Sequence, residues 1–274
     1  MKNIILPIDF STASYNASEY AVSLASVFKA NVTFINAVPP LLLYDEEAAP
    51  AMLMRHEKLI EKNRALIEDQ IELLSKKSEV TMEGFVAEGS PFNVIQEIAL
   101  EKNADLIIMG MKDKGKSNSI FGSTTNIVIR KSSFPVLVIP EGILYESIDK
   151  ITFASDFNPE TEMNRYALLE NIAQKYDSFV RVLNVQKDEI VLSDSEALGK
   201  MKTHFAFTYL NHDFTVIEDD NVVEGIIDYL QMHRADLLVM MAQKHSLIER
   251  LFGEMYTTEM SRLTKIPLLV LQNK

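Results

Sequence analysis

Short apolar runs alternate along the chain with longer segments of helical periodicity. The runs are rich in Ile, Val and Leu and predict strands near residues 3–8, 31–37, 80–86, 105–109 and 136–139, and again near 150–155, 179–185, 214–218, 236–241 and 268–271. Serines at 11 and 14 are N-cap candidates for a helix over 15–29, and Ser90-Pro91 opens another helix. Buried strands joined by crossover helices predict an α/β fold with doubly wound parallel sheets.

The same order of elements occurs twice. The matching runs are 3–10 with 150–157, 104–109 with 235–240, and 135–138 with 267–270. Three matches in one order indicate a duplication. We therefore predict two tandem five-stranded domains, residues 1–147 and 148–274. The matching runs are 147 residues apart at the first strand but only 131 apart at the fourth, so the second domain has lost about fifteen residues between them. Segment 39–54 has no counterpart there. The short junction, 141–149, predicts that the domains pack together.

Composition narrows the classes of function. Of 274 residues, 47% are hydrophobic and 24% charged, which is typical of a soluble globular protein. The net charge of −12 disfavours nucleic acid as a partner. No apolar stretch reaches the roughly 20 residues that cross a bilayer, so we expect no membrane association. Asp9 ends the first apolar run too early for a signal peptide, and cysteine is absent. We therefore expect a cytoplasmic protein.

Candidate ligand-binding residues lie where predicted strands end. Asp9 follows the first strand and Gly110 ends the fourth, and Gly115 and the motif Gly122-Ser123-Thr124 come next, at the start of a helix. In doubly wound sheets ligands bind beyond the carboxyl ends of the strands. Glycines allow close backbone approach, and free N–H groups at a helix start favour an anion. This pattern predicts a phosphate-binding loop.

These segments resemble the universal stress protein family. The resemblance rests on LPIDFS, on ADLIIMG and on GSTTNIVIRKSSFPVLVIP, in the family's order over essentially the whole chain. It implies ATP or a related adenine nucleotide as ligand and a stress-response role. By the same resemblance, adenine and ribose would contact Pro7, Ile8, Asp9 and Ala37, and ribose and phosphates would contact Gly110, Met111, Gly122, Ser123 and Thr124.

The loop departs from the pattern of ATP-binding members, which reads Gly, two residues, Gly, nine residues, Gly-Ser/Thr. Asp113 stands at the second Gly and the loop is one residue short, although Gly115 is a substitute. A carboxylate about 4 Å from a phosphate costs roughly 1 kcal/mol in water and about 4 at an effective dielectric of 20. Lysines 112, 114 and 116 flank it, and a bridging Mg²⁺ would reverse the effect. The sign of the net effect stays open.

The second copy has a more degenerate loop, over residues 242–254. Ala242 stands for the first Gly, and Glu254 follows Gly253 where the family has Ser or Thr. We predict no ATP there and a structural or regulatory role. The family pairs its last strands across a dimer, so the strands ending at Ile139 and Leu271 are expected to pair within this chain as a pseudo-dimer. A homodimer stays open.

Other interpretations stay open as well. Asp9 could be only a turn residue, and the retention of Asp156 in the degenerate copy favours that. The apolar segment 41–44, followed by acids at 45–47, is either a lid or partner-binding segment or interface packing. The alternative function is a non-nucleotide regulatory module that binds a protein or small ligand. The spacing of the histidines matches no metal-binding motif, so we predict no metal site. No residue near the loop is a candidate general base, so we expect at most slow ATP hydrolysis as enzymatic activity.

Overall fold

The computed structural model describes residues 1–42, 48–112, 123–187, 191–242 and 265–272. The elements of the first half are β1 (Asn3–Pro7), α1 (Thr12–Phe28), β2 (Asn31–Val38), α2 (Ala49–Ser75), β3 (Met82–Glu88), α3 (Pro91–Glu101), β4 (Leu106–Met111), α4 (Ser123–Lys131) and β5 (Val136–Pro140). Those of the second half are β6 (Lys150–Ala154), η2 (Met163–Tyr166), α5 (Ala167–Tyr176), β7 (Phe179–Gln186), α6 (Asp194–Ala206), β8 (Asn211–Glu218), α7 (Val222–Met232), β9 (Leu237–Ala242) and β10 (Leu268–Gln272).

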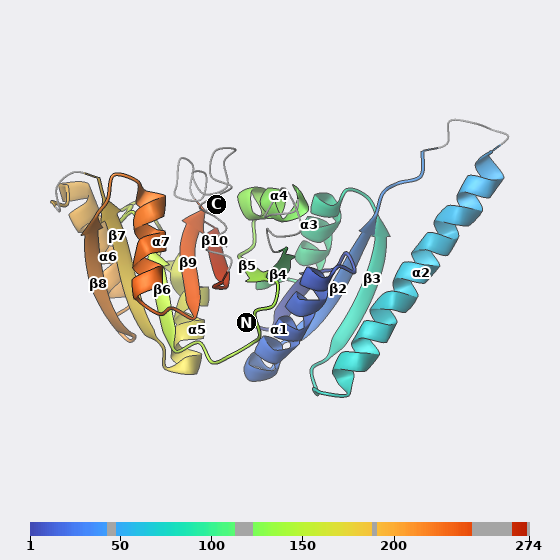
Figure 1. The fold of residues 1–274 in the computed structure, drawn as a ribbon, viewed down its shortest axis with the longest axis horizontal. Coiled ribbons are helices and arrows are strands. Elements are labelled where there is room, and N and C mark those ends of the chain that lie inside the picture. Colours follow the sequence, from blue (N-terminus) through green and yellow to red (C-terminus); the bar gives the residue numbers. More distant parts are fainter. Residues whose placement is uncertain (43–47, 113–122, 188–190, 243–264, 273–274) are drawn as a thin grey trace.

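The ten strands of the described residues join in one sheet that runs across the molecule (Figure 1). The order is β3-β2-β1-β4-β5-β10-β9-β6-β7-β8, so each half repeats the same five-strand order. Neighbours within a half are parallel, and β5 and β10 are antiparallel, with Val138 opposite Leu268. The prediction of two tandem doubly wound parallel sheets is confirmed, and the last strands of the two halves pair within the chain.

Helices cover both faces of this sheet. Successive residues of β1 point to opposite faces, so Ile4 and Leu6 belong to one core cluster and Ile5 to the other. The first cluster takes side chains from α1, α2 and α5, and the second takes them from α3, α4 and α7. Both faces are buried, which explains why the strands read as continuous apolar runs.

The repeated Ala-Asp motif has a structural role in both halves. Asp105 Oδ2 accepts hydrogen bonds from the backbone N–H groups of Lys2 and Asn3, at 2.5 and 3.0 Å. Asp236 Oδ2 accepts the equivalent bonds from residues 149 and 150, at 3.1 and 2.9 Å. Each aspartate thereby fixes the start of the first strand of its half.

The second half is shorter mainly because one of its helices is shorter than its counterpart in the first half. α2 has 27 residues, whereas its counterpart α6 has 13. α2 lies beside the edge strand β3, and its N-terminal part extends past the strands (Figure 1). Its buried residues are all in the C-terminal third, namely Ile67, Gln70 and Leu74. Of the proposed lid segment, Leu42 is exposed, and residues 43–47 lie outside the described residues.

The junction between the halves packs on α1, as its shortness predicted. Asn16 donates hydrogen bonds to the carbonyls of Pro140 and Ile143, at 3.4 and 3.0 Å. The ring of Tyr20 meets that of Tyr145 edge-on at 5.2 Å, and the Tyr145 hydroxyl bonds that of Tyr176 on α5. Among the described helices, none is long and apolar enough to span a membrane.

Candidate functional site

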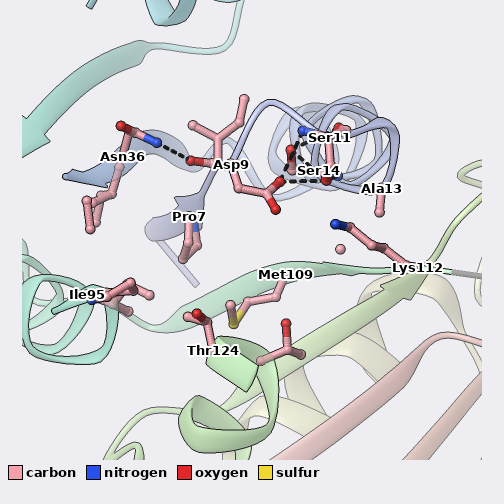
Figure 2. A pocket seen from close by; sticks show the side chains of 16 residues that line it. Pro7, Asp9, Ser11, Ala13, Ser14, Asn36, Ile95, Met109, Lys112 and Thr124 are labelled. Atoms are coloured by element: carbon pink, nitrogen blue, oxygen red, sulfur yellow. Dashed lines mark hydrogen bonds between the residues drawn. The ribbon is translucent and has the colours of Figure 1, made fainter. Parts of the chain in front are cut away.

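A cavity of about 320 Å³ opens at the carboxyl ends of β1, β2 and β4 (Figure 2). Parallel strands end at the same edge of the sheet, so residues far apart in the sequence meet there. The lining residues are Pro7, Ile8, Asp9, Ser11, Ala13, Ser14, Ile35, Asn36, Ala37, Pro91, Ile95, Met109, Gly110, Lys112, Thr124 and Thr125. Six of the ten predicted site residues are among them: Pro7, Ile8, Asp9, Ala37, Gly110 and Thr124.

Asp9 is held in a tight turn between β1 and α1. The next residue, Phe10, has φ of 61° and is in the left-handed region. Asp9 Oδ1 accepts hydrogen bonds from the Ser11 backbone N–H, at 3.1 Å, and the Ser11 hydroxyl, at 2.5 Å. Ser11 is also the N-cap of α1, its hydroxyl accepting the N–H of Ser14 at 3.3 Å. The turn that aims the carboxylate therefore also starts the helix.

These bonds keep Asp9 ionised. Burial opposes the charge, but the hydrogen bonds from Ser11, with smaller contributions from Ser14 and Lys112, outweigh burial and lower the pKa of Asp9. Figure 2 shows the Lys112 side chain extending toward the Asp9 carboxylate from the end of β4. Sequence reasoning considered Lys112 only as a neighbour of Asp113. The signal that could have found it is its place directly after a strand end.

Asn36 fixes the opposite wall of the cavity. Its amide N–H donates to the carbonyl of Ile8 at 2.7 Å, and its Oδ1 accepts from the amide of Asn63, on α2, at 2.8 Å. The side chain is buried, so both bonds matter for the local stability. Asn36 was also missed. The signal that could have found it is the repeat, because Asn184 stands at the equivalent position of the second half and its amide donates to the carbonyl of Ser155 at 2.8 Å.

Gly110 is required by helix packing. A Cβ added there would lie 2.3 Å from the backbone oxygen of Ala13 and 2.9 Å from the nitrogen of Ser14. The first turn of α1 therefore rests directly on the end of β4. Gly110 also lines the cavity, so its backbone both allows the close approach of α1 and forms part of the cavity wall.

The remaining predicted residues have different positions. Met111 is in the core, at 4% exposure, and does not line the cavity. Thr124 and the buried Thr125 line it from the first turn of α4, which begins at Ser123 and has no acidic residue in that turn. Gly115, Gly122 and the deviating Asp113 lie outside the described residues.

The second half differs at the corresponding positions, and the sheet register corrects one of our assignments. In the first half Gly110 pairs with Ile139 of the neighbouring strand, and Leu271 is the counterpart of Ile139 in the second half. Leu271 pairs with Met241, so Met241 and not Ala242 is the counterpart of Gly110. The repeat of residues 104–109 in 235–240 gives the same correspondence, so the second loop was taken to start one residue too late, at Ala242. Met241 instead packs its side chain into the core.

Other positions of the second half differ too. By the strand pairing, Val185 is the counterpart of Ala37. The pKa of Asp156 is raised, chiefly by burial and further by the charge of Glu196, whereas that of Asp9 is lowered. Residues 253 and 254, whose sequence argued against ATP, lie outside the described residues.

The described residues include no group of three or more His, Asp or Glu side chains placed to hold a metal ion. The cavity offers instead apolar walls from Ile8, Ile35 and Ile95, a carboxylate that accepts hydrogen bonds, and one ammonium group. Such a site suits an apolar or aromatic body with hydroxyl groups near Asp9 and negative charge near Lys112.

Comparisons with known proteins agree with this architecture. A family model described as the universal stress protein family matches residues 1–140. The chain is 31% identical over 139 residues to a universal stress protein of Methanocaldococcus jannaschii, which covers 50% of this chain and 81% of that relative. It is 27% identical over 137 residues to a universal stress protein of Helicobacter pylori, covering 50% and 98%.

The fold as a whole also has a solved counterpart. The structure of a universal stress protein from Archaeoglobus fulgidus is similar with a TM-score of 0.74 and 16% identity, covering 99% of this chain and 98% of that one. The similarity extends over both halves, so the two-unit fold is shared along the whole length. With the match of the family model to half of the sequence, it follows that this chain belongs to the universal stress protein family.

Proposed function

We propose that the protein is a stress-response protein whose first unit, residues 1–147, binds ATP or a related adenine nucleotide, while the second unit, residues 148–274, is structural or regulatory. The observation that carries the proposal is the cavity at the carboxyl ends of β1, β2 and β4, with Asp9 and Lys112 on its wall and the start of α4 beside it. Its volume of about 320 Å³ is at the lower end of small-molecule sites, roughly 300–1,000 Å³.

Each part of a nucleotide would meet suitable groups. The base would lie against the apolar walls near Ile8 and Ala37. The ribose hydroxyls would donate to Asp9, whose lowered pKa keeps it an acceptor at neutral pH. The phosphates would approach Lys112 and the N-terminus of α4, where backbone N–H groups and the helix dipole favour negative charge.

The same chemistry supports binding over catalysis. Efficient general-base catalysis at neutral pH needs a group with a pKa near the operating pH. The pKa of Asp9 is shifted away from that range. Asp9 is therefore suited to orient a ligand and poorly suited to activate water. Mg²⁺, if it takes part, would act together with the phosphates, because the described residues provide no metal cluster of their own.

The direct test is calorimetry of the full chain with ATP, ADP, AMP and adenosine, each with and without Mg²⁺. Substituting Ala37→Leu should abolish the heat of binding, because the larger side chain fills the base position. Val185→Leu is the matched control, since it makes the counterpart position larger and should leave binding unchanged. No heat at millimolar nucleotide would reject the proposal and favour the non-nucleotide module.

The series of ligands separates the two parts of the site. Binding of adenosine without a gain from phosphates would mean that the cavity is functional and that the loop containing Asp113 is not. A steady gain from AMP to ATP would mean that the phosphate-binding part contributes. Loss of the gain from phosphates in Lys112→Gln, with folding and adenosine binding retained, would assign the main electrostatic contribution to that lysine.

A further inference from the structure

A second cavity, of about 400 Å³, lies at the seam between the two halves. Its wall is formed by α1, by the junction and by the starts of β9 and β10. The lining residues are Tyr20, Gly142, Ile143, Leu144, Glu146, Ser147, Arg234, Ala235, Asp236, Lys265 and Pro267. It shares no residue with the first cavity, so a ligand there would be independent of the proposed nucleotide. Ligand sites are frequent at such interfaces between domains.

The guanidinium of Arg234 is oriented by a fixed aspartate. Its Nε lies 3.2 Å from Asp236 Oδ1, while Asp236 Oδ2 already accepts two backbone N–H groups from residues 149 and 150. Only 12% of the Asp236 side chain is exposed, against 71% for Arg234. Asp236 is thus committed to the backbone and to one edge of Arg234, and Arg234 itself lines the cavity.

The other acid in the wall holds Arg234 only weakly. The nearest oxygen of Glu146 is 3.6 Å from Arg234, beyond hydrogen-bond distance, and 76% of the Glu146 side chain is exposed. An exposed pair of this kind is worth between about 0 and 1 kcal/mol. A better acceptor would therefore displace Glu146 from Arg234 with little loss.

Lys265 adds a second cation on the same wall. It precedes β10, its side chain is exposed, and it lines the cavity beside Pro267. The remaining wall is largely apolar, from Ile143, Ala235 and the ring of Tyr20. Two cations with spare hydrogen-bond donors, set beside an apolar surface, match an oxyanion attached to a small organic body. Arg is especially suited to this, because its planar fork binds carboxylate or phosphate through two parallel bonds.

We propose that this seam cavity binds a small organic anion through a carboxylate or phosphate group held by Arg234 and Lys265, with Glu146 displaced. The ligand would contact the junction, α1 and the second half at once. Its binding would therefore strengthen the attachment of one half to the other and give the protein a ligand-dependent stability.

The experiment is an NMR titration of the ¹⁵N-labelled full chain with inorganic phosphate in one arm and succinate in the other. The signals to follow are the Arg234 Nε–H and the backbone amides of Ala235 and Asp236. We expect saturable shifts of these signals for at least one anion, and the arm that binds more tightly identifies phosphate or carboxylate as the preferred group. The absence of saturation in both arms overturns the proposal.

Variants assign the site. Arg234→Gln and Lys265→Gln should each weaken binding at least tenfold, while the charge-matched controls Arg165→Gln and Lys175→Gln leave it unchanged. Lys112→Gln distinguishes the cavities: if it removes the shifts and Arg234→Gln does not, the anion binds in the first cavity and the proposal is wrong.

A gain of affinity completes the test and does not depend on the stability of Arg234→Gln. In Glu146→Gln the competing carboxylate is neutral, so anion binding should become about two- to fivefold tighter, the equivalent of an exposed ion pair. Unchanged affinity in Glu146→Gln, with unchanged affinity in Lys265→Gln, would show that the anion does not bind at this wall.

Discussion

The substitution Gly110→Ala tests the most specific packing contact at the candidate site. The added Cβ would lie 2.3 Å from the oxygen and 2.5 Å from the carbonyl carbon of Ala13, both backbone atoms of α1. Real Cβ contacts are essentially never under 3.0 Å, so the helix start or the strand end must move by about 1 Å. Because the obstacle is backbone, a change of rotamer cannot relieve the overlap.

The expected loss of stability is about 1–3 kcal/mol, the range for overpacking in a well-packed region. Replacing Gly also restricts the unfolded chain, which offsets roughly 0.4–1 kcal/mol of that loss. The shift of α1 would in addition separate Ser11 from Asp9, so a ligand that uses Asp9 would bind more weakly. Stability is measured by urea unfolding followed by far-UV circular dichroism, and the signal is a lower midpoint at an unchanged slope.

A matched control separates crowding from the effects of the residue change itself. Gly142 has open space around its Cβ position, but its φ is +85°. Gly142→Ala should therefore cost only the strain of the left-handed region, roughly 1–2 kcal/mol, and leave the first cavity unchanged, because Gly142 does not line it. If Gly110→Ala unfolds within about 0.5 kcal/mol of the parent protein and keeps the geometry at Asp9, the close approach of α1 to β4 is wrong.

Three further substitutions are predicted. The fold favours the ionised form of Asp9, so the carboxylate stabilises the folded protein above its ordinary pKa, and this stabilisation is lost as pH falls through the lowered folded value. Asp9→Asn should therefore lower the free energy of unfolding at pH 7. A difference in stability between variant and parent that persists in strong acid would contradict this. For Asp156 the sign is opposite, because its raised pKa makes the charged form unfavourable; Asp156→Asn should stabilise at pH 7, as measured by thermal unfolding. Asn36→Ala removes the hydrogen-bond partner of the Ile8 carbonyl and of the Asn63 amide, and should lower the free energy of unfolding by about 2 kcal/mol. Equal urea midpoints for variant and parent would refute this prediction.

Much of the fold followed from the sequence because buried parallel strands are apolar on both faces. A run such as 105–109 has no competing interpretation as a surface segment, and the repeat supplied the same evidence twice. The helices of the second half were harder to place. Its first crossover begins with a short 3₁₀ segment, Met163–Tyr166, and the following helix has 10 residues against 17 in α1. The apolar pattern repeats while the length of the connection does not.

The site was predictable where it depends on strand ends. Asp9 and Ala37 come from different strands, and the rule that ligands bind at the carboxyl edge brings them into one cavity. Asn36 and Lys112 could not be predicted in the same way, because their roles depend on side-chain direction and on partners in other elements. The assignment of Ala242 failed for a different reason. The Ala-Asp match of 104–109 with 235–240 already places Gly110 opposite Met241, as the sheet register does, but the second loop was compared from the next residue.

The duplication provides an internal control for deciding which residues serve the fold and which could serve a ligand. The turn after the first strand has the same geometry in both halves: Phe10 and Phe157 are both left-handed, and each is preceded by an aspartate whose Oδ1 accepts the backbone N–H two residues later. The turn explains why Asp is kept in both copies, so Asp alone is weak evidence for a nucleotide. What separates the copies is the direction of the pKa shift of that aspartate. Burial, with a smaller contribution from Glu196, raises the pKa of Asp156, whereas at Asp9 the two hydrogen bonds from Ser11 outweigh burial and lower the pKa.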